Sequence, residues 1–419
     1  MRDVADAPRA ALRIAYLCDQ SPDDHGSYSG GNARLRDALA ARGAQITELP
    51  LHWGAAEPLR RAVQAMPASV RVRAFWRARL AAGGLAAAPV NRALRAGRFD
   101  AVFCPYAFHA LLGVRPPPGT VSVHTSDATP AIYRDSEVGR HFGSYLRASR
   151  LLDPLIEAAE RRVFRSTDLL LWPSRWLAEA ATARYGLDPG RSLHVPWGAN
   201  VPDPGPAEDP PRLGTGPTRL LIVGRQWEAK GGPLVLRILQ RLRAEGADVR
   251  LDVVGCDPPD ARAAPGVTVH GHLDKADPAQ FADFTRLFRS AHFLVMPSFE
   301  SYGFAFCEAS AYGLPSLCYD VGGVPVREGR NGHALPADAR AADFAARVTA
   351  YLADPAAYDA LRLSSRREYE TRLNWTAWAD RTLTLIRAAA ATRAAGVAGD
   401  GTDATAPDPA VAAPRRRAQ

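Results

Sequence analysis

Residues 296–325 read M-P-S-F-E-S-Y-G-F-A-F-C-E-A-S-A-Y-G-L-P-S-L-C-Y-D-V-G-G-V-P and contain the signals of a strand, a loop and a helix in succession. The apolar run 293–296 predicts a short buried strand, and a loop that carries Glu300 follows it. Gly303 permits a tight turn, after which we expect a helix with Glu308 in its early turns. The backbone N–H groups at the start of such a helix favour an anion. The segment therefore predicts an anion-binding unit of an α/β domain.

Short apolar strands alternate with helical segments through most of the chain. In the first half, strands are expected at 12–17, 101–104, 121–124, 169–172 and 193–196. In the second half, they are expected at 220–223, 249–254, 293–296 and 316–319. Short buried strands separated by helices indicate a mostly parallel sheet that is covered on both faces. The repeated pattern predicts two Rossmann-like domains, which bind ligands at the carboxyl ends of their strands.

The segment 201–217 separates the two halves, because its six prolines and three glycines exclude a helix or a central strand. We therefore predict an α/β protein whose two Rossmann-like domains, 1–205 and 206–374, face each other across a cleft. A helix over 375–390 is expected to cross back to the first domain. The remainder, 391–419, is rich in Ala, Gly, Pro, Asp and Thr and is expected to be disordered.

The composition of the 419 residues argues against several classes of protein. No apolar run approaches the roughly 18 residues of a membrane span, and the charged first nine residues do not resemble a signal peptide. We therefore expect a cytoplasmic protein. Five widely spaced cysteines without a C-x-x-C pair argue against a disulfide framework and a zinc site. No G-x-G-x-x-G segment follows the first strand of either half, which disfavours a dinucleotide dehydrogenase.

Arginine is concentrated between Glu57 and Phe99, where nine arginines accompany one acidic residue. The formal charge of this stretch is therefore +8 (nine minus one), equal to that of the whole chain. Apolar residues are interleaved with these arginines: Val70, Val72, Phe75, Trp76 and Leu80. The stretch predicts a surface for an anionic membrane or an acidic acceptor, which would make the protein peripheral at the inner face of the membrane. A solvated helical face is the alternative, and we expect no nucleic-acid partner.

Three further segments place polar residues directly after predicted strands: 27–32 (S-Y-S-G-G-N), 121–129 (V-S-V-H-T-S-D-A-T) and 224–232 (G-R-Q-W-E-A-K-G-G). In the last of these, Arg225 can hold two phosphate oxygens with its planar fork, whereas Lys230 acts as a point charge. Lys230 is one of only two lysines among the 52 basic residues, which indicates a local requirement for an ammonium group. Two such cations would stabilise the charge that develops on a leaving diphosphate.

Together the four segments resemble the retaining glycosyltransferases of family 4, which adopt the GT-B fold. Glu300 and Glu308 match the E-x(7)-E motif of that family. The resemblance implies that Glu300 faces the donor sugar and that Glu308 binds the ribose hydroxyls. It also implies that the main chain of Gly303, Phe304 and Ala305 lies near the donor.

The resemblance assigns catalytic roles to three other residues. Arg225 and Lys230 would neutralise the diphosphate leaving group, and His124 would lie near the transferred sugar. Asp127, three residues later, would orient His124 or the acceptor.

Three weaker assignments concern donor binding. Gly30 and Gly31 would approach the diphosphate through their backbone, as the glycine loop of the family does. Leu273 would offer its backbone to the base, with Lys275 nearby.

The function implied by the resemblance is transfer of a sugar, with retention of configuration, from a nucleotide diphosphate sugar to an unidentified acceptor. UDP is the expected nucleotide, and polysaccharide or glycoconjugate biosynthesis is the expected context. The nucleotide sugar is a co-substrate, and neither a cofactor nor a metal is expected, because the sequence has no Asp-x-Asp motif and no cluster of histidines. Two alternatives are a nucleotide-sugar epimerase or hydrolase on the same fold, and a non-catalytic nucleotide-sugar-binding protein.

Overall fold

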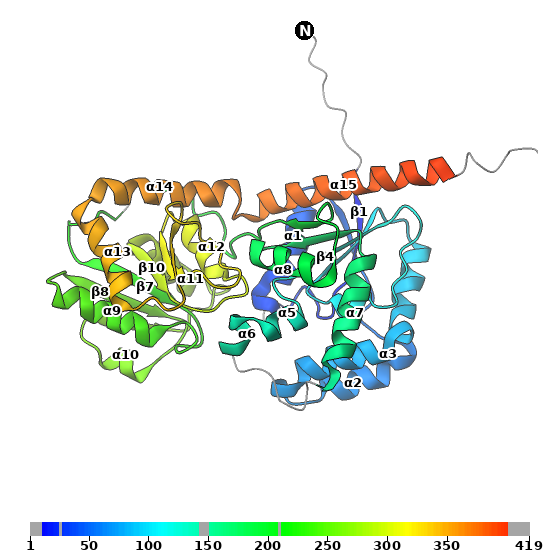
Figure 1. The fold of residues 1–419 in the computed structure, drawn as a ribbon, viewed down its shortest axis with the longest axis horizontal. Coiled ribbons are helices and arrows are strands. Elements are labelled where there is room, and N and C mark those ends of the chain that lie inside the picture. Colours follow the sequence, from blue (N-terminus) through cyan, green and yellow to red (C-terminus); the bar gives the residue numbers. More distant parts are fainter. Residues whose placement is uncertain (1–10, 25–26, 142–150, 208–210, 401–419) are drawn as a thin grey trace, which may run out of the picture.

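The computed structural model describes residues 11–24, 27–141, 151–207 and 211–400, which form two α/β domains (Figure 1). The first domain has a six-stranded sheet in the spatial order β2 (Gln45–Glu48), β1 (Arg13–Tyr16), β3 (Ala101–Pro105), β4 (Val121–Thr125), β5 (Leu169–Trp172), β6 (Ser192–His194). The second has the order β12 (Gly332–Leu335), β11 (Ser316–Tyr319), β10 (Phe293–Met296), β7 (Thr218–Val223), β8 (Val249–Val254), β9 (Val267–Gly271). Neighbouring strands are parallel throughout both sheets, which confirms the predicted fold class.

Helices cover both faces of each sheet. The helices of the first domain are η1 (Ser27–Gly30), α1 (Gly31–Ala41), η2 (Gly54–Ala56), α2 (Glu57–Gln64), α3 (Ala68–Ala96), α4 (Phe108–Leu111), α5 (Pro130–Asp135), α6 (Glu137–His141), α7 (Asp153–Ser166) and α8 (Arg175–Tyr185). The later helices are α9 (Gly232–Ala244), α10 (Pro259–Ala263), α11 (Pro278–Ser290), α12 (Phe304–Ala311), α13 (Ala341–Ala353), α14 (Pro355–Thr371) and α15 (Trp375–Asp400). Within the described ranges, none of these helices is long and apolar enough to cross a membrane.

The side chains of the first sheet alternate between two buried layers. Ile14 and Tyr16 pack with residues of α1 and α15, whereas Ala15 and Leu17 pack with residues of α3, α4, α7 and α8. This alternation follows from the two-residue period of a strand. The alternation therefore determines which polar side chains at the strand ends point toward the second domain.

Three strands, β2, β9 and β12, were not expected from the sequence, and all three lie at sheet edges. The residues of β2 and β9 are largely exposed or only half-buried. A strand that is not buried on both faces does not need a continuous apolar run, so its sequence gives no such signal. The central strands, which are apolar and buried, fall close to their expected positions.

Helix α15 begins at Trp375, as expected, but it continues to Asp400. The prediction that disorder begins at residue 391 is therefore wrong for 391–400, and 401–419 lie outside the described residues. Alanine, which is frequent in residues 388–398, has the highest intrinsic helix propensity and favours this continuation. α15 packs on α1, β4 and β5 of the first domain, and Arg42 on α1 donates to Asp380 (2.6 Å).

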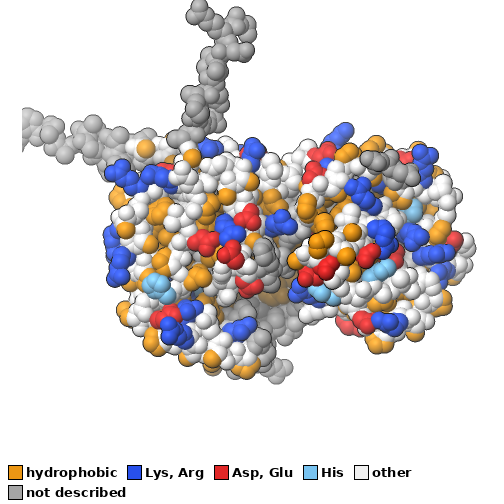
Figure 2. All heavy atoms as spheres, turned by 180° about the vertical axis from the view of Figure 1, so that it is seen from behind, with side chains coloured by type: hydrophobic (Ala, Val, Ile, Leu, Met, Phe, Trp, Pro, Cys, Tyr) orange, Lys and Arg blue, Asp and Glu red, His pale blue; other side chains and the backbone are white. Residues whose placement is uncertain are grey.

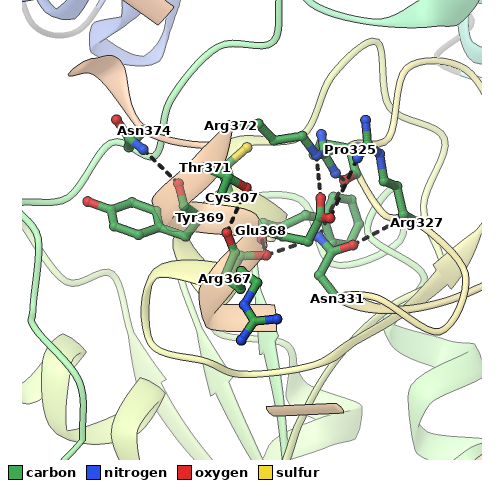
Figure 3. Close-up of polar contacts among 12 residues, drawn as sticks. Cys307, Pro325, Arg327, Asn331, Arg367, Glu368, Tyr369, Thr371, Arg372 and Asn374 are labelled. Atoms are coloured by element: carbon green, nitrogen blue, oxygen red, sulfur yellow. Dashed lines mark hydrogen bonds and ion pairs between the residues drawn. The ribbon is translucent and has the colours of Figure 1, made fainter. Parts of the chain in front are cut away.

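The C-terminal end of α14 is joined to the loop between β11 and β12 by a polar cluster (Figure 3). Glu368 on α14 pairs with Arg372 and, at 3.5 Å, with Arg327 of that loop. Arg372 also donates to the carbonyl oxygen of Pro325 (2.7 Å). The cluster fixes the loop that follows Gly323, where a Cβ atom would lie 2.8 Å from the Ser174 hydroxyl of the first domain.

Candidate active site

Lys230 and Glu300 form an ion pair at the carboxyl edge of the second sheet. Lys230 follows β7 and Glu300 follows β10, which are neighbours in the sheet. The stem of Lys230 lies over Gly224, where a Cβ atom would be 2.4 Å from the lysine Cγ. The Ser298 hydroxyl donates to the same oxygen of Glu300 (2.8 Å). Glycine at 224 thus leaves the room that lets the lysine reach a largely buried carboxylate.

Lys275 and Glu308 form a second ion pair on the same edge. The distance between Lys275 Nζ and Glu308 Oε1 is 2.5 Å, and the glutamate side chain is only 5% exposed. Lys275 also lies over the ring of Phe284, 4.6 Å from its centroid. Both lysines of the chain therefore contact the two glutamates of the E-x(7)-E motif, one each.

The start of α12 meets the first domain through aromatic side chains. Gly303, the residue before the helix, has a φ of 86°, which favours glycine. The ring of Phe304 stacks on Trp197 at 5.8 Å, and the Tyr302 hydroxyl donates to the carbonyl oxygen of Trp197 (2.6 Å). Ala305 is half-buried beside them. The predicted donor-binding residues 303–305 thus lie at the contact between the domains.

The glycine loop of the first domain lies against the same contact. Gly30 has a φ of 76° and precedes Gly31, the first residue of α1. A Cβ atom on Gly31 would lie 2.1 Å from the Tyr106 hydroxyl and 3.3 Å from the ring of Phe304. The Tyr106 hydroxyl is buried without a hydrogen-bond partner, and its ring stacks on Tyr28 at 4.1 Å. Gly31 is therefore required by the close approach of Tyr106 within the first domain, beside Phe304 of the second domain.

Asp127 lies at the domain interface, where it accepts a hydrogen bond from the Ser301 hydroxyl (2.6 Å). Burial raises the pKa of Asp127 above its usual range, and the bond from Ser301 opposes that shift. Ser301 and Ser298 were not among the predicted site residues. The signal in the sequence was that both serines lie close to Glu300. This signal is weak, because serine is also common in ordinary loops.

His124 does not join this group, in contrast to the expectation for a residue near the sugar. Its side chain packs against Phe164 and Trp172 in the core of the first domain, and its Nδ1–H donates to the carbonyl oxygen of Cys104 (2.9 Å). Thr125, the next residue, accepts a hydrogen bond from Trp197 on the other face of the sheet. Adjacent residues of a strand point to opposite faces, so His124 points away from the contact between the domains. Burial lowers its pKa to about 3.

The other predicted residues lie on loops at the edge of the second sheet. Arg225 is exposed on the loop after β7, and Leu273 is half-buried on the loop after β9. Among the described residues, no group of three or more His, Cys, Asp or Glu side chains could hold a metal ion. The face seen in Figure 2 is hollowed where the two domains meet.

Two parallel α/β domains that meet at the carboxyl edges of their sheets define the GT-B fold. Solved structures with this architecture are similar to the chain along most of its length. The sucrose-phosphate synthase from Thermosynechococcus elongatus matches with a TM-score of 0.59 and 18% identity, over 91% of this chain and 100% of that chain. WaaG, a glycosyltransferase involved in lipopolysaccharide biosynthesis, matches with a TM-score of 0.56 and 17% identity, over 89% of this chain and 99% of that chain.

Two family models match the sequence, one in each domain. The model of Glycosyltransferase Family 4 matches residues 32–203, and that of Glycosyl transferases group 1 matches residues 217–354. The chain therefore belongs to glycosyltransferase family 4, as the sequence motifs predict. A D-inositol 3-phosphate glycosyltransferase from Streptomyces bingchenggensis (strain BCW-1) is 30% identical over 218 residues, 47% of this chain and 48% of the relative. The chain thus spans about half the length of this curated relative.

Proposed function

We propose that the protein transfers a sugar, with retention of configuration, from a nucleotide diphosphate sugar to an acceptor held by the first domain. The two lysine–glutamate pairs at the carboxyl edge of the second sheet are the observation that carries the proposal. They combine charged side chains for a diphosphate and carboxylates for sugar hydroxyls. The glycine loop at the start of α1 adds backbone N–H groups from the opposite domain.

The leaving diphosphate is assigned to Arg225 and Lys230. When the bond between the anomeric carbon and the phosphate oxygen breaks, negative charge accumulates on the diphosphate. Cations placed against the departing diphosphate stabilise this charge, most strongly where a bound donor excludes water. Because these two side chains supply the positive charge, we expect turnover to persist in the presence of a metal chelator.

Retention is explained by transfer on one face of the sugar. The acceptor oxygen bonds to the anomeric carbon on the face that the phosphate leaves, and the leaving phosphate accepts the proton of the acceptor hydroxyl. Glu300 positions the sugar through its hydroxyls, and Asp127 faces the same region from the first domain. Product of inverted configuration in an NMR spectrum, or a trapped glycosyl–enzyme intermediate, would contradict this course.

Two other functions fit the same fold. An epimerase or hydrolase would convert the donor completely without an acceptor. A protein that only binds nucleotide sugars would release no nucleotide with any acceptor. Glu300, Lys230 and Arg225, which serve the reacting bond rather than nucleotide binding alone, argue against a protein that only binds nucleotide sugars; turnover without an acceptor distinguishes the epimerase or hydrolase.

The test is calorimetric binding of UDP, GDP and ADP to the wild type, to Glu308→Ala and to Arg381→Ala. Arg381 is exposed on α15 and serves as the control. One nucleotide, expected to be UDP, should bind the wild type and the control equally. Its binding to Glu308→Ala should weaken by about 1–3 kcal/mol through the loss of a hydrogen-bonding carboxylate. If no nucleotide binds, or if Glu308→Ala binds as the wild type does, the assignment of the site is wrong.

A further inference from the structure

Exposed apolar side chains gather at one end of the first domain. In the described part of the chain, eight large hydrophobic residues are exposed, and seven of them belong to the region of α2, α3 and the start of α7: Leu59, Met66, Val70, Leu85, Leu151, Leu152 and Leu155. In Figure 1, α2 and the first turn of α7 lie at the same end of this domain, away from α14 and α15. Single exposed apolar residues need no explanation, but a group of them marks an interaction surface.

These exposed side chains do not take part in the packing of α2 against α3. The two helices share a small core of Trp53, Val63, Phe75 and Ala86. Phe75, which the sequence suggested as part of an apolar surface, is only 5% exposed and belongs to that core. Val70 and Leu59 are more than 40% exposed, so they are not needed for the fold of the domain.

The same end of the domain carries positive charge that is not balanced by acidic residues. Among residues 57–71, three arginines accompany a single acid, Glu57, which pairs with Arg60 at 2.5 Å and with Arg61 at 3.4 Å. Arg61 retains 77% of its side-chain exposure, and Arg71 is also exposed.

The acids at the start of α7 are paired elsewhere, so they do not neutralise this charge. Asp153 contacts Arg134 at 3.0 Å, and Glu157 contacts Arg184 at 2.9 Å.

We propose that this end of the first domain docks on an anionic lipid membrane. The docking surface consists of Leu59, Arg61, Met66, Val70 and Arg71 together with Leu151, Leu152 and Leu155. Exposed leucines can enter the boundary between headgroups and acyl chains, while the arginines stay at the level of the lipid phosphates. The proposal is independent of the chemistry assigned to the cleft.

Other occupants use only part of this surface. An acidic polymer would pair with the arginines but would leave the leucines in water. A second copy of the chain, related by two-fold symmetry, would cover the leucines but would bring the arginines of both copies together. A membrane with anionic lipids satisfies both kinds of side chain at once.

The test is sedimentation of the full chain with vesicles of phosphatidylcholine, with and without phosphatidylglycerol. Binding is expected only with phosphatidylglycerol and should decrease as salt is added. Arg61→Glu/Arg71→Glu should weaken binding by at least about 30-fold, because each basic residue near the surface contributes about a fivefold preference. Leu151→Ser/Leu155→Ser should weaken it by about tenfold or more through lost apolar burial.

Matched controls separate docking from a general loss of folding or charge. Leu363→Ser replaces the remaining exposed leucine, which lies on α14, and Arg250→Glu reverses an exposed arginine on β8. Both should bind vesicles as the wild type does, and all variants should melt at similar temperatures. UDP binding by the Arg61→Glu/Arg71→Glu variant, measured by calorimetry, tests the proposed function independently of membrane docking.

Three outcomes would overturn the proposal. The first is no binding to phosphatidylglycerol vesicles at low salt, and the second is equal loss of binding in the controls. The third is a dimer in sedimentation velocity that Leu151→Ser/Leu155→Ser dissociates, because the surface would then be an interface between copies.

Discussion

Each of the two lysines contacts one glutamate of the motif, which explains why lysine is retained in a chain that otherwise uses arginine. The ammonium of Lys230 passes over Gly224 to reach Glu300, where a planar guanidinium would need more room. Sequence reasoning predicted Lys230 and Glu300 as site residues but not that they touch. Their contact joins loops 70 residues apart, and no local pattern encodes such a pairing.

The Lys230–Glu300 pair should contribute to stability as well as to the site. Lys230→Met is expected to reduce the free energy of unfolding by about 1–3 kcal/mol, because it leaves a carboxylate buried without its counter-charge. Adding Glu300→Gln should restore at least half of this loss. Urea denaturation of both single variants and the double variant measures the coupling.

The exposed pair of Arg241 and Glu245 on α9 provides a control for this cycle. Its coupling should stay within about 0.5 kcal/mol, as is usual for surface pairs. Purely additive effects of Lys230→Met and Glu300→Gln would show that the two side chains do not depend on each other.

The burial of His124 predicts a specific dependence of stability on pH. Its pKa is about 3 in the folded protein and about 6.5 in an unfolded chain. Between these values the unfolded state binds more protons, so its contribution is complete above pH 6.5 and is lost as the pH falls toward 3. From pH 7 to pH 5 the loss should be about 2 kcal/mol, and His124→Gln should lack it.

Unfolding by urea at pH 7 and pH 5 checks this prediction. Trp172→Phe disturbs the same core without removing a titrating group, so it should keep the pH dependence of the wild type. If His124→Gln also keeps it, the histidine is already protonated or exposed in the folded state. The sequence predicted the strand that carries His124. The face of the sheet to which its side chain points follows from the alternation of side chains along β4.

At the scale of elements, the sequence predicted the central strands and one edge strand, β6, and missed the other three edge strands. β10 (F-L-V-M) is a continuous apolar run, and β11 (S-L-C-Y) is buried at its first three positions, so a short apolar stretch between helices identifies each of them. β2 is mostly exposed, and β12 begins with Gly-His. Their pairing depends on a neighbouring strand that is already in place, which a single sequence window does not contain.

The loop before α1 gives a prediction about close approach between elements. Gly31→Ala would place a Cβ atom 2.1 Å from the Tyr106 hydroxyl, so one of the two must move. The expected cost is about 1–3 kcal/mol of stability, typical of overpacking. Tyr106→Phe removes the clashing atom, so the variant Gly31→Ala/Tyr106→Phe should regain most of the stability.

Gly30→Ala is the matched control, because its φ of 76° makes an alanine costly through backbone strain. Tyr106→Phe should therefore not rescue Gly30→Ala. Thermal denaturation of the wild type, the three single variants and the two double variants with Tyr106→Phe decides the matter. Rescue of both glycine variants, or of neither, would contradict the assigned contact between Gly31 and Tyr106.

At the scale of the whole molecule, the last helix packs on the first domain, although the second domain precedes this helix in the sequence. α14 and α15 lie end to end along one side of both domains (Figure 1). α14 belongs to the second domain, where Tyr358 and Leu361 are buried, whereas α15 covers the first sheet. The sequence predicted a helix over 375–390 that crosses back to the first domain, whereas its contacts with α1, β4 and β5 follow only from the tertiary structure.

Because α15 completes the first domain, a substitution in this helix should destabilise elements that are distant from it in the sequence. Ile386 is fully buried, and Ile386→Ala is expected to cost about 2–5 kcal/mol. Hydrogen exchange should accelerate in α1 and β4, which α15 contacts, while β7 and β8 exchange as in the wild type. Thr384→Ala, at an exposed position of the same helix, should change stability by less than about 0.5 kcal/mol. Faster exchange throughout both domains would instead mean that they unfold as one unit, with α15 stabilising both.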